Sequence, residues 1–307
     1  MRAVFMGTPE FAVPALGAML EAGVEVAGVV TQPDRPAGRG REVTASPVKR
    51  VAVERGIEVL QPLKIKAPDA VDWVQGKHAD VIVVVGYGQI IPASVFDYPK
   101  LGTVNVHASL LPKYRGAAPI QWAIANGETV TGVTTMRIEA GLDTGDILLA
   151  REVEIGPEET ASELSPRLAG MGAELLIETL RGLEAGTITP RKQDNAAATY
   201  APILKKKDGR VDWSRSARAI FNQVRGFDPW PGAFTTFRGE LLQLRRVRVA
   251  GGSAGGPGRI EVAGRTLLVA CGEGGLEVLE LQPEAKRRMT AQEFLNGWRP
   301  ESGEMLG

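Results

Sequence analysis

The sequence predicts an α/β protein in which a mostly parallel, doubly wound, Rossmann-like sheet is followed by a small, OB-like β-barrel. Strand and helix patterns alternate in the first half of the chain, which favours a parallel sheet with helices on both faces. Short strands punctuated by Gly and Pro dominate the last third, a spacing typical of a barrel. The 307 residues, 44% of them hydrophobic, suffice for two packed domains.

The elements of the first half follow from hydrophobic patterning. A continuous β-branched run at 79–85 is typical of a strand that is covered on both faces. Thr160-Ala-Ser-Glu163 matches a capping box and predicts a helix that ends near Gly186, although Pro166 favours a slightly later start. Strands are expected at 2–6, 24–30, 79–85, 103–107, 133–138 and 147–153, with a further helix at 11–20.

Residues 189–207 are polar and have no clear period, so they are interpreted as a linker. This linker separates a first domain at 1–188 from a second domain at 208–307. In the second domain, short strands are expected at 234–237, 241–249, 258–262, 266–270 and 276–281, with helices at 214–225 and 290–298.

Composition excludes several classes of protein. The single cysteine, Cys271, cannot form an internal disulfide and lies in an apolar run, which predicts a small buried hydrophobe. With only His78 and His107 besides this cysteine, a zinc site of the usual Cys/His kind cannot be built, and no metal is expected. No apolar run approaches the ~20 residues of a membrane span, and no signal-peptide pattern precedes the first strand. These features predict a cytoplasmic protein that does not bind membranes.

Charge is unevenly divided along the chain. Up to Pro190 there are 17 Lys and Arg against 23 Asp and Glu, whereas from Arg191 onward there are 19 against 13. The two parts therefore carry −6 and +6. The excess in the C-terminal part indicates a polyanionic partner, with a merely solvated basic face as the alternative.

The sequence contains neither the Gly-x-Gly-x-x-Gly dinucleotide fingerprint after its first strand nor a Walker Gly-Lys-Ser/Thr motif. Nicotinamide chemistry and phosphate transfer from ATP are therefore disfavoured. Ligands of open parallel sheets still bind at the carboxyl ends of the strands, and the chemistry is sought there.

Three polar residues near one strand end suit attack of an amine on a carbonyl. Asn105 and His107 point to the same face of the strand at 103–107, because side chains alternate with period two. Asp143 stands in Gly141-Leu-Asp-Thr-Gly, a loop that can bring a carboxylate close to a ligand. The amide and a protonated imidazole can donate to an oxyanion, and the carboxylate can help to move a proton. Singly, the His is also compatible with a structural role and the Asp with a turn.

These residues lie in motifs that resemble the signature of the folate-dependent formyltransferases: Asn105-Val-His-Ala-Ser-Leu-Leu-Pro112, Tyr114-Arg-Gly-Ala-Ala-Pro119 and Gly141-Leu-Asp-Thr-Gly-Asp146. The resemblance covers nearly the whole chain and implies that Asn105, His107 and Asp143 are the catalytic trio. It implies binding of 10-formyltetrahydrofolate as formyl donor, without a metal. The implied folate contacts are Ser109, Leu110, Leu111 and Pro112, with Val85, Gly86, Tyr87, Gly88, Gln89 and Ile90 at the pterin pocket.

The basic loop that begins at Thr31-Gln-Pro-Asp-Arg-Pro-Ala-Gly-Arg-Gly40 resembles the methionyl-tRNA formyltransferase branch of that family. This resemblance implies initiator methionyl-tRNA as partner and a bacterial cytosol as location; a monomer is expected. Basic side chains of the loop suit phosphates, and Lys205 to Lys207 would extend that surface. The predicted tRNA contacts are Arg35, Arg39, Arg41, Lys49, Lys205, Lys206 and Lys207, with Arg245, Arg246, Arg248 and 286–288 as further candidates.

Two rival functions remain at this stage. A formyltransferase acting on a sugar-nucleotide amine would share the trio but would not need the basic loop or the +6 C-terminal part. A non-catalytic RNA-binding protein would need no intact trio. Separately, the turn Asp228-Pro-Trp-Pro231 is expected to hold a packed Trp.

Overall fold

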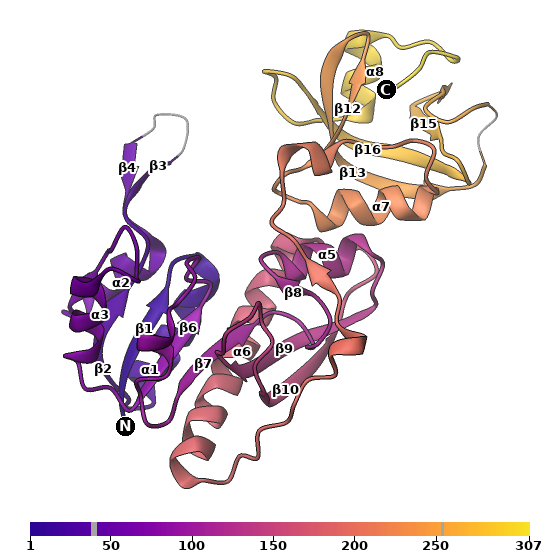
Figure 1. Cartoon of the computed structure of the whole chain (residues 1–307). Helices are drawn as coiled ribbons and strands as arrows, with labels where there is room; N and C mark the ends of the chain where they lie inside the picture. The colour runs from indigo at the N-terminus through magenta and orange to yellow at the C-terminus, as the bar shows by residue number, and fades with distance from the viewer. Residues whose placement is uncertain (38–41, 253–254) are drawn as a thin grey trace. The chain divides into compact units, whose positions relative to one another are not determined.

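The computed structural model describes residues 1–37, 42–252 and 255–307 (Figure 1). The predicted tRNA contacts Arg39 and Arg41 lie outside the described residues. The chain forms two compact units. The first comprises Met1–Gly116, Thr131–Val153 and Ser165–Tyr200, and the second comprises Ala117–Val130, Glu154–Leu164 and Ala201–Gly307. The second unit therefore takes two segments that precede the predicted boundary at 189–207, and this boundary stays a prediction.

The elements follow one another along the chain in an alternating order. The N-terminal ones are β1 (Arg2–Gly7), η1 (Glu10–Ala12), α1 (Val13–Glu21), β2 (Glu25–Val30), β3 (Arg35–Ala37), β4 (Glu42–Thr44), α2 (Pro47–Glu54), β5 (Val59–Leu60), α3 (Pro68–Gln75), β6 (Val81–Val85), α4 (Ala93–Phe96), β7 (Thr103–His107) and β8 (Arg115–Gly116). The next are α5 (Pro119–Ala125), β9 (Val130–Arg137), β10 (Ile147–Glu154), α6 (Ala161–Ala185), η2 (Asn195–Ala197), β11 (Tyr200–Ala201) and η3 (Lys206–Gly209). The last are α7 (Ala217–Gly226), β12 (Ala233–Phe237), β13 (Glu240–Ala250), β14 (Ile260–Ala263), β15 (Thr266–Ala270), β16 (Gly275–Pro283), β17 (Met289–Thr290) and α8 (Ala291–Trp298).

The large sheet has the strand order β10-β9-β7-β6-β1-β2-β5, and the pairs from β7 through β6, β1 and β2 to β5 are parallel. Strand β9 pairs with β7 in the antiparallel sense. Every residue of β6 is buried, as its unbroken β-branched sequence predicts. The predicted α/β class is therefore confirmed, and the parallel order brings the carboxyl ends of β1, β6 and β7 to one edge of the sheet.

Helix α6 begins at Ala161, so the later start that Pro166 suggested is wrong. The capping box is formed: the Thr160 backbone N–H donates to Glu163 Oε2 at 2.9 Å, and the Glu163 N–H donates to Thr160 Oγ1 at 3.3 Å. Pro166 removes one helical hydrogen bond, but Leu164 and Leu168 on either side of it are fully buried. Capping and burial together keep this turn helical.

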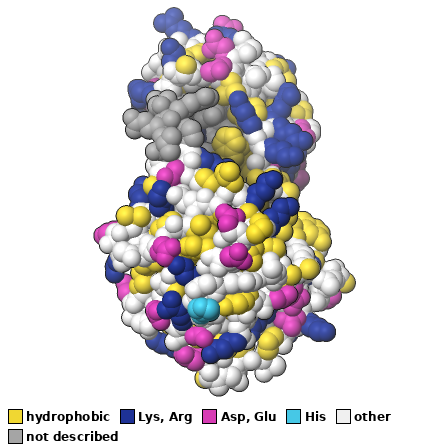
Figure 2. All heavy atoms as spheres, turned by 60° about the vertical axis from the view of Figure 1, so that its left-hand side comes forward, with side chains coloured by type: hydrophobic (Ala, Val, Ile, Leu, Met, Phe, Trp, Pro, Cys, Tyr) yellow, Lys and Arg dark blue, Asp and Glu magenta, His cyan; other side chains and the backbone are white. Residues whose placement is uncertain are grey.

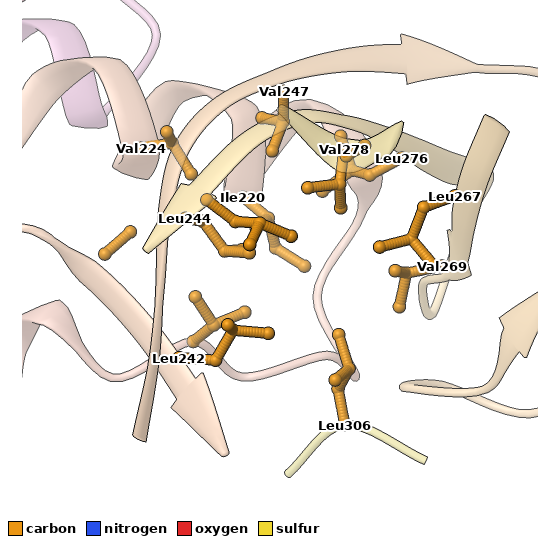
Figure 3. Packing of buried hydrophobic residues seen from close by; sticks show 14 of the residues in the cluster. Ile220, Val224, Leu242, Leu244, Val247, Leu267, Val269, Leu276, Val278 and Leu306 are labelled. Atoms are coloured by element: carbon orange, nitrogen blue, oxygen red, sulfur yellow. The ribbon is translucent and has the colours of Figure 1, made fainter. Parts of the chain in front are cut away.

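The second unit contains a six-stranded antiparallel sheet in the order β12-β13-β16-β15-β14, with β17 paired to β16. Isolated bridges join Phe237 to Leu306 and Arg259 to Met305, so the end of the chain lies between the edge strand β12 and the entry to β14. This closure confirms the predicted small barrel. Apolar side chains from the strands and from α7 converge on its interior, where Leu306 is buried among them (Figure 3).

Two expectations about single residues have different outcomes. Cys271 is buried, as predicted, and burial raises the pKa of its thiol to about 11. Trp230 is 57% exposed, so the expectation of a packed Trp in this turn is wrong. Its neighbours Pro229 and Pro231 both follow cis peptide bonds.

Candidate active site

Asn105 and His107 lie on β7 in the middle of the sheet, on one face. Asn105 stands opposite Val84 of β6 and Met136 of β9, and His107 stands opposite Thr134. The alternate residue of β9, Thr135, hydrogen-bonds Thr179 of α6 at 2.8 Å, so α6 packs against the other face. The face that carries Asn105 and His107 is therefore the one that α6 leaves uncovered.

His107 is 6% exposed and is held by one backbone carbonyl. Its Nε2 lies 2.9 Å from the Tyr114 carbonyl oxygen. Because a carbonyl only accepts hydrogen bonds, Nε2 carries a hydrogen, and Nδ1 is left to face the loop at 141–146. Tyr114 has a φ of 61°, a left-handed conformation that turns its carbonyl toward the ring at a cost of about 1–3 kcal/mol.

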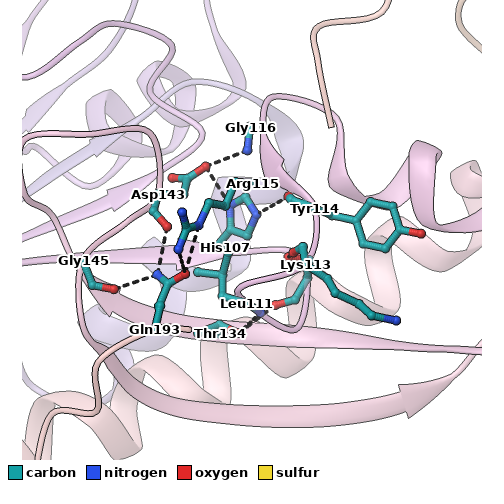
Figure 4. Close-up of polar contacts among 11 residues, drawn as sticks. His107, Leu111, Lys113, Tyr114, Arg115, Gly116, Thr134, Asp143, Gly145 and Gln193 are labelled. Carbon is teal, nitrogen blue, oxygen red and sulfur yellow. Dashed lines mark hydrogen bonds and ion pairs between the residues drawn. The ribbon is translucent and has the colours of Figure 1, made fainter. Parts of the chain in front are cut away.

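Asp143 faces that second nitrogen. Its Oδ2 lies 3.7 Å from His107 Nδ1, within ion-pair distance but longer than a hydrogen bond, and accepts a hydrogen bond from the Gly116 N–H at 2.8 Å (Figure 4). Asp143 has a φ of 51°, which Asp tolerates better than most residues. A Cβ at Gly145 would collide with the Arg137 carbonyl oxygen, so the tight course of the loop requires glycine there.

Asn105 is half-buried, and its side-chain amide has no hydrogen-bond partner among the residues that the structure describes. The structure thus brings His107 and Asp143 together and places Asn105 two residues earlier on the same strand face. An amide with open donors beside an imidazole and a carboxylate can stabilise an oxyanion and move a proton.

The predicted folate segment at 109–112 is fixed by its own turn. Ser109 Oγ donates to the Lys113 carbonyl at 2.6 Å, and Thr134 Oγ1 donates to the Ser109 carbonyl at 2.7 Å. The Leu111 N–H donates to the same Thr134 hydroxyl at 3.2 Å. Leu111 packs with Met136 and Ile147. The Ser109 hydroxyl is therefore used within the turn, and the Thr134 hydroxyl fixes the backbone on both sides of Leu110.

The predicted pterin wall at 85–90 follows β6. Gly86 and Gly88 have positive φ values of 57° and 86°, and the Tyr87 carbonyl accepts from Thr8 Oγ1 and Gln32 Nε2, both at 3.1 Å. The Gln89 amide is engaged by the Ile65 N–H and the Pro62 carbonyl. Ile90, by contrast, is 94% exposed. Val85 and Tyr87 are buried, and the Tyr87 hydroxyl has no hydrogen-bond partner in the described part of the chain.

Regular elements flank the basic loop in the described residues. Strands β3 and β4 form a two-stranded ribbon that projects from the first unit (Figure 1), and α2 follows with Ser46 as its N-cap. Lys49 lies in α2, with its Nζ 2.5 Å from Asp34 Oδ2. The hydrogen bond from Lys49, and then the one from Gln61, lowers the pKa of Asp34. Arg35 is exposed and donates to Gln32 Oε1.

The predicted basic surface of the C-terminal part contains cations without an ion-pair partner and cations that pair with glutamate. Lys205 is the N-cap of η3, and Lys206 and Lys207 are its first residues. All three are exposed and have no carboxylate within ion-pair distance in the described ranges. Most of the remaining arginines named above pair with glutamate: Arg246 with Glu158, Arg248 with Glu277, Arg287 with Glu293 and Arg288 with Glu280. Figure 2 shows the same mixing, with Lys and Arg scattered among Asp and Glu on the visible face.

Two residues near the loop at 141–146 were not predicted from the sequence: Arg115 and Gln193. Arg115 is 3% exposed, and Gln193, within the predicted linker, bonds both to it and to the loop (Figure 4). Arg115 lies in the motif Tyr114-Arg-Gly-Ala-Ala-Pro119, but nothing in the local sequence indicates that its side chain is buried. Gln193 is a lone polar residue in a polar stretch, and only the folded chain shows its partners.

No helix in the described part of the chain is long and apolar enough to cross a membrane. In the same ranges, no group of three or more His, Cys, Asp or Glu is arranged to hold a metal ion.

Comparison with known proteins identifies the class. Residues 1–180 match the family model described as formyl transferase, and residues 203–299 match the model described as formyl transferase, C-terminal domain. The chain belongs to the formyl transferase family and is a transferase. A methionyl-tRNA formyltransferase of Solibacter usitatus (strain Ellin6076) is 59% identical over 308 residues, which covers 100% of this chain and 99% of the relative.

Solved structures show the same fold at low identity. An N-formyltransferase from Helicobacter canadensis in complex with folinic acid and dTDP-3-aminofucose has a TM-score of 0.67 at 18% identity, covering 92% of this chain and 98% of that one. A methionyl-tRNA formyltransferase from Clostridium thermocellum has a TM-score of 0.55 at 17% identity, covering 81% and 93%. At these identities the fold does not distinguish a sugar amine from an aminoacyl-tRNA as acceptor.

Proposed function

We propose that this enzyme transfers the formyl group of 10-formyltetrahydrofolate to the free amino group of methionyl-initiator-tRNA, in the cytoplasm and as a monomer. The observation that carries the proposal is the ion-pair contact of His107 with Asp143, on the sheet face that also presents the unpartnered amide of Asn105. Full-length similarity at 59% identity to a methionyl-tRNA formyltransferase supports this choice of acceptor.

The reaction needs a path for one proton and a stabiliser for one oxygen. The neutral amine attacks the formyl carbon, and the formyl oxygen becomes an oxyanion to which the Asn105 amide N–H donates. The proton that leaves the attacking nitrogen passes to the His107 and Asp143 pair. Collapse of the tetrahedral adduct breaks the bond to N10 of the folate, which takes up the proton. The products are formylmethionyl-tRNA and tetrahydrofolate.

Folate binding is assigned to the two loops beside this site. The turn at 109–112 and the wall at 85–90 follow β7 and β6, which are neighbours in the sheet. Parallel strands direct the segments after them to the same sheet edge. Val85 and Tyr87 are buried, and Gly86 and Gly88 have positive φ values, so the backbone at 85–88 can bind the pterin closely. The exposed side chain of Ile90 can pack on the face of the pterin ring.

The tRNA contacts are assigned to exposed cations that do not already pair with carboxylates. Among the described residues, Lys205, Lys206 and Lys207 meet this condition, and Arg35 is exposed with Gln32 as its partner. Such cations release counterions from a phosphate backbone without first breaking an ion pair. Arg39 and Arg41 are proposed as contacts on the sequence resemblance alone.

One assay tests the whole proposal. The protein is incubated with 10-formyltetrahydrofolate and methionyl-initiator-tRNA, a sugar-nucleotide amine, or no amine, and donor consumption is followed. We expect consumption with the tRNA and formation of formylmethionyl-tRNA. Faster consumption with the sugar-nucleotide amine would overturn the acceptor assignment, and equal consumption without an amine would indicate a hydrolase.

A further inference from the structure

Gln193 uses its full hydrogen-bonding capacity beside the site. Its Nε2 donates to the backbone carbonyls of Asp143, at 2.8 Å, and Gly145, at 2.7 Å. Its Oε1 accepts from Arg115 Nε at 3.0 Å and from Nη2 at 2.7 Å. Two donors and two lone pairs are all that a side-chain amide has. Gln193 therefore bonds two separate parts of the site at once (Figure 4).

The orientation of this amide is set by Arg115. A guanidinium only donates, so the Gln193 oxygen must face it and the NH₂ group must face the loop. Arg115 is 3% exposed, and no described carboxylate lies within ion-pair distance of it. Its charge is met by the amide oxygens of Gln193 and Asn195, the latter at 2.8 Å from Nη2. A flipped Gln193 would bring like donors together beside a buried cation, so the amide has one stable orientation.

The loop carbonyls that accept from Gln193 belong to the catalytic segment. Asp143 is left-handed, with a φ of 51°, and lies outside regular secondary structure. The direction of its carboxylate therefore depends on its peptide planes. One hydrogen bond from Gly116 holds the carboxylate, and the bonds from Gln193 hold the backbone at Asp143 and Gly145. A shift of about 1 Å at such a site can lower a rate by about 10².

We propose that Gln193 is a positioning residue for Asp143, oriented by the buried Arg115. It touches neither substrate and acts by fixing the backbone from which the Asp143 carboxylate approaches His107. The inference rests on the proposed function of the trio, but it does not depend on which amine is the acceptor.

The variant Gln193→Glu distinguishes the acceptor contacts of the Gln193 amide from its donor contacts. A carboxylate still accepts from Arg115 but cannot donate to the Asp143 and Gly145 carbonyls. We expect kcat to fall by about 10 to 10², with little change in donor affinity. Asn195→Ala is the matched control, because it removes a bond to Arg115 without touching the loop; its kcat should stay near wild type.

A double-mutant cycle with Asp143→Ala decides between positioning and general stability. Without a carboxylate to position, Gln193→Glu should cost little further activity in single turnovers. Thermal melting and donor titration on the same preparations report on folding and on the folate site. An undiminished loss in the Asp143→Ala background, or near-normal kcat for Gln193→Glu, would overturn the proposal. If wild type does not formylate methionyl-tRNA, the cycle is run with whichever amine consumes the donor, so the two hypotheses fail separately.

Discussion

The site around His107 and the cationic surface at 191–307 differ in the partners of their charged side chains. In the site, His107, Asp143 and Arg115 contact backbone carbonyls, backbone N–H groups or amide oxygens, and two of the three are buried. On the surface, exposed arginines pair with glutamates at five positions of the described residues: Arg238, Arg246, Arg248, Arg287 and Arg288. Spacing and motif predicted residues that lie together, whereas a charge count predicted cations that are already partly neutralised. Net charge alone therefore overstates what a surface offers to a polyanion.

The largest effect on rate should come from a change in the site around His107. His107→Ala removes the ring that faces Asp143, and loss of one such group costs about 10²–10³ in rate at comparable sites. Turnover should fall by at least that factor, while donor binding and melting temperature change little. Steady-state formylation kinetics with a donor titration measure both. Near-normal turnover would mean that the buried ring is structural.

Thr134 tests whether the turn at 109–112 depends on the hydroxyl beneath it. Thr134→Val keeps the shape of the side chain but leaves the Ser109 carbonyl and the Leu111 N–H without the Thr134 hydroxyl as a partner. A buried group left unpaired costs about 1–3 kcal/mol, so the free energy of unfolding should fall by that amount. Denaturant unfolding measures it, and donor affinity should weaken as well. An unchanged midpoint would show that the turn is held by packing alone.

The contrast within the surface is tested by two triple variants. Replacing Lys205, Lys206 and Lys207 by Gln should make the slope of log tRNA affinity against log salt shallower by about 2 to 3, at roughly 0.9 per phosphate. Replacing the paired Arg246, Arg248 and Arg288 by Gln should change it less. Binding at two salt concentrations gives both slopes. A larger change for the arginine variant would reverse the assignment.

Lys49 should give the smallest effect. Its ammonium already contacts the half-buried Asp34, and exchanging this ion pair for a contact with phosphate contributes about 0.5–1 kcal/mol at most. Lys49→Ala should thus weaken tRNA binding by about two- to fivefold. Arg39→Ala in the same assay is the comparison, and both variants should bind the donor normally. Equal losses in the two variants would show that Lys49 leaves Asp34 when tRNA binds.

Strong local patterns predicted most of the fold. β7 and β15 have the predicted bounds. Both contain β-branched residues, which favour strands whose side chains are buried on one or both faces. Short helices such as α2 and α3 were not placed individually, and their first turns are set by Ser46 and by Pro68. The predicted late start of α6 was wrong because a complete capping box outweighs one proline.

The catalytic roles of Asn105, His107 and Asp143 stay predictions. The alternation of side chains along a strand, together with the glycines around Asp143, was nevertheless enough to select residues that the fold brings together. The rest of the site could not be predicted, because its contacts are distant in sequence. Gln193 bonds to residues 78 and 50 positions earlier, and nothing in a polar, aperiodic stretch marks it. A segment interpreted as a linker thus contributes to the site, with a further hydrogen bond from the Tyr114 N–H to Thr199 Oγ1.

The bridges made by Met305 and Leu306 also bear on self-association. They occupy backbone groups at Phe237 on the edge strand β12 and at Arg259 before β14. Unpaired strand edges are templates for pairing with another chain, and Leu306 additionally fills the barrel interior. A protease that removes these two residues would expose both edges and an apolar hole together. The last turn of the barrel therefore serves as its protection against aggregation.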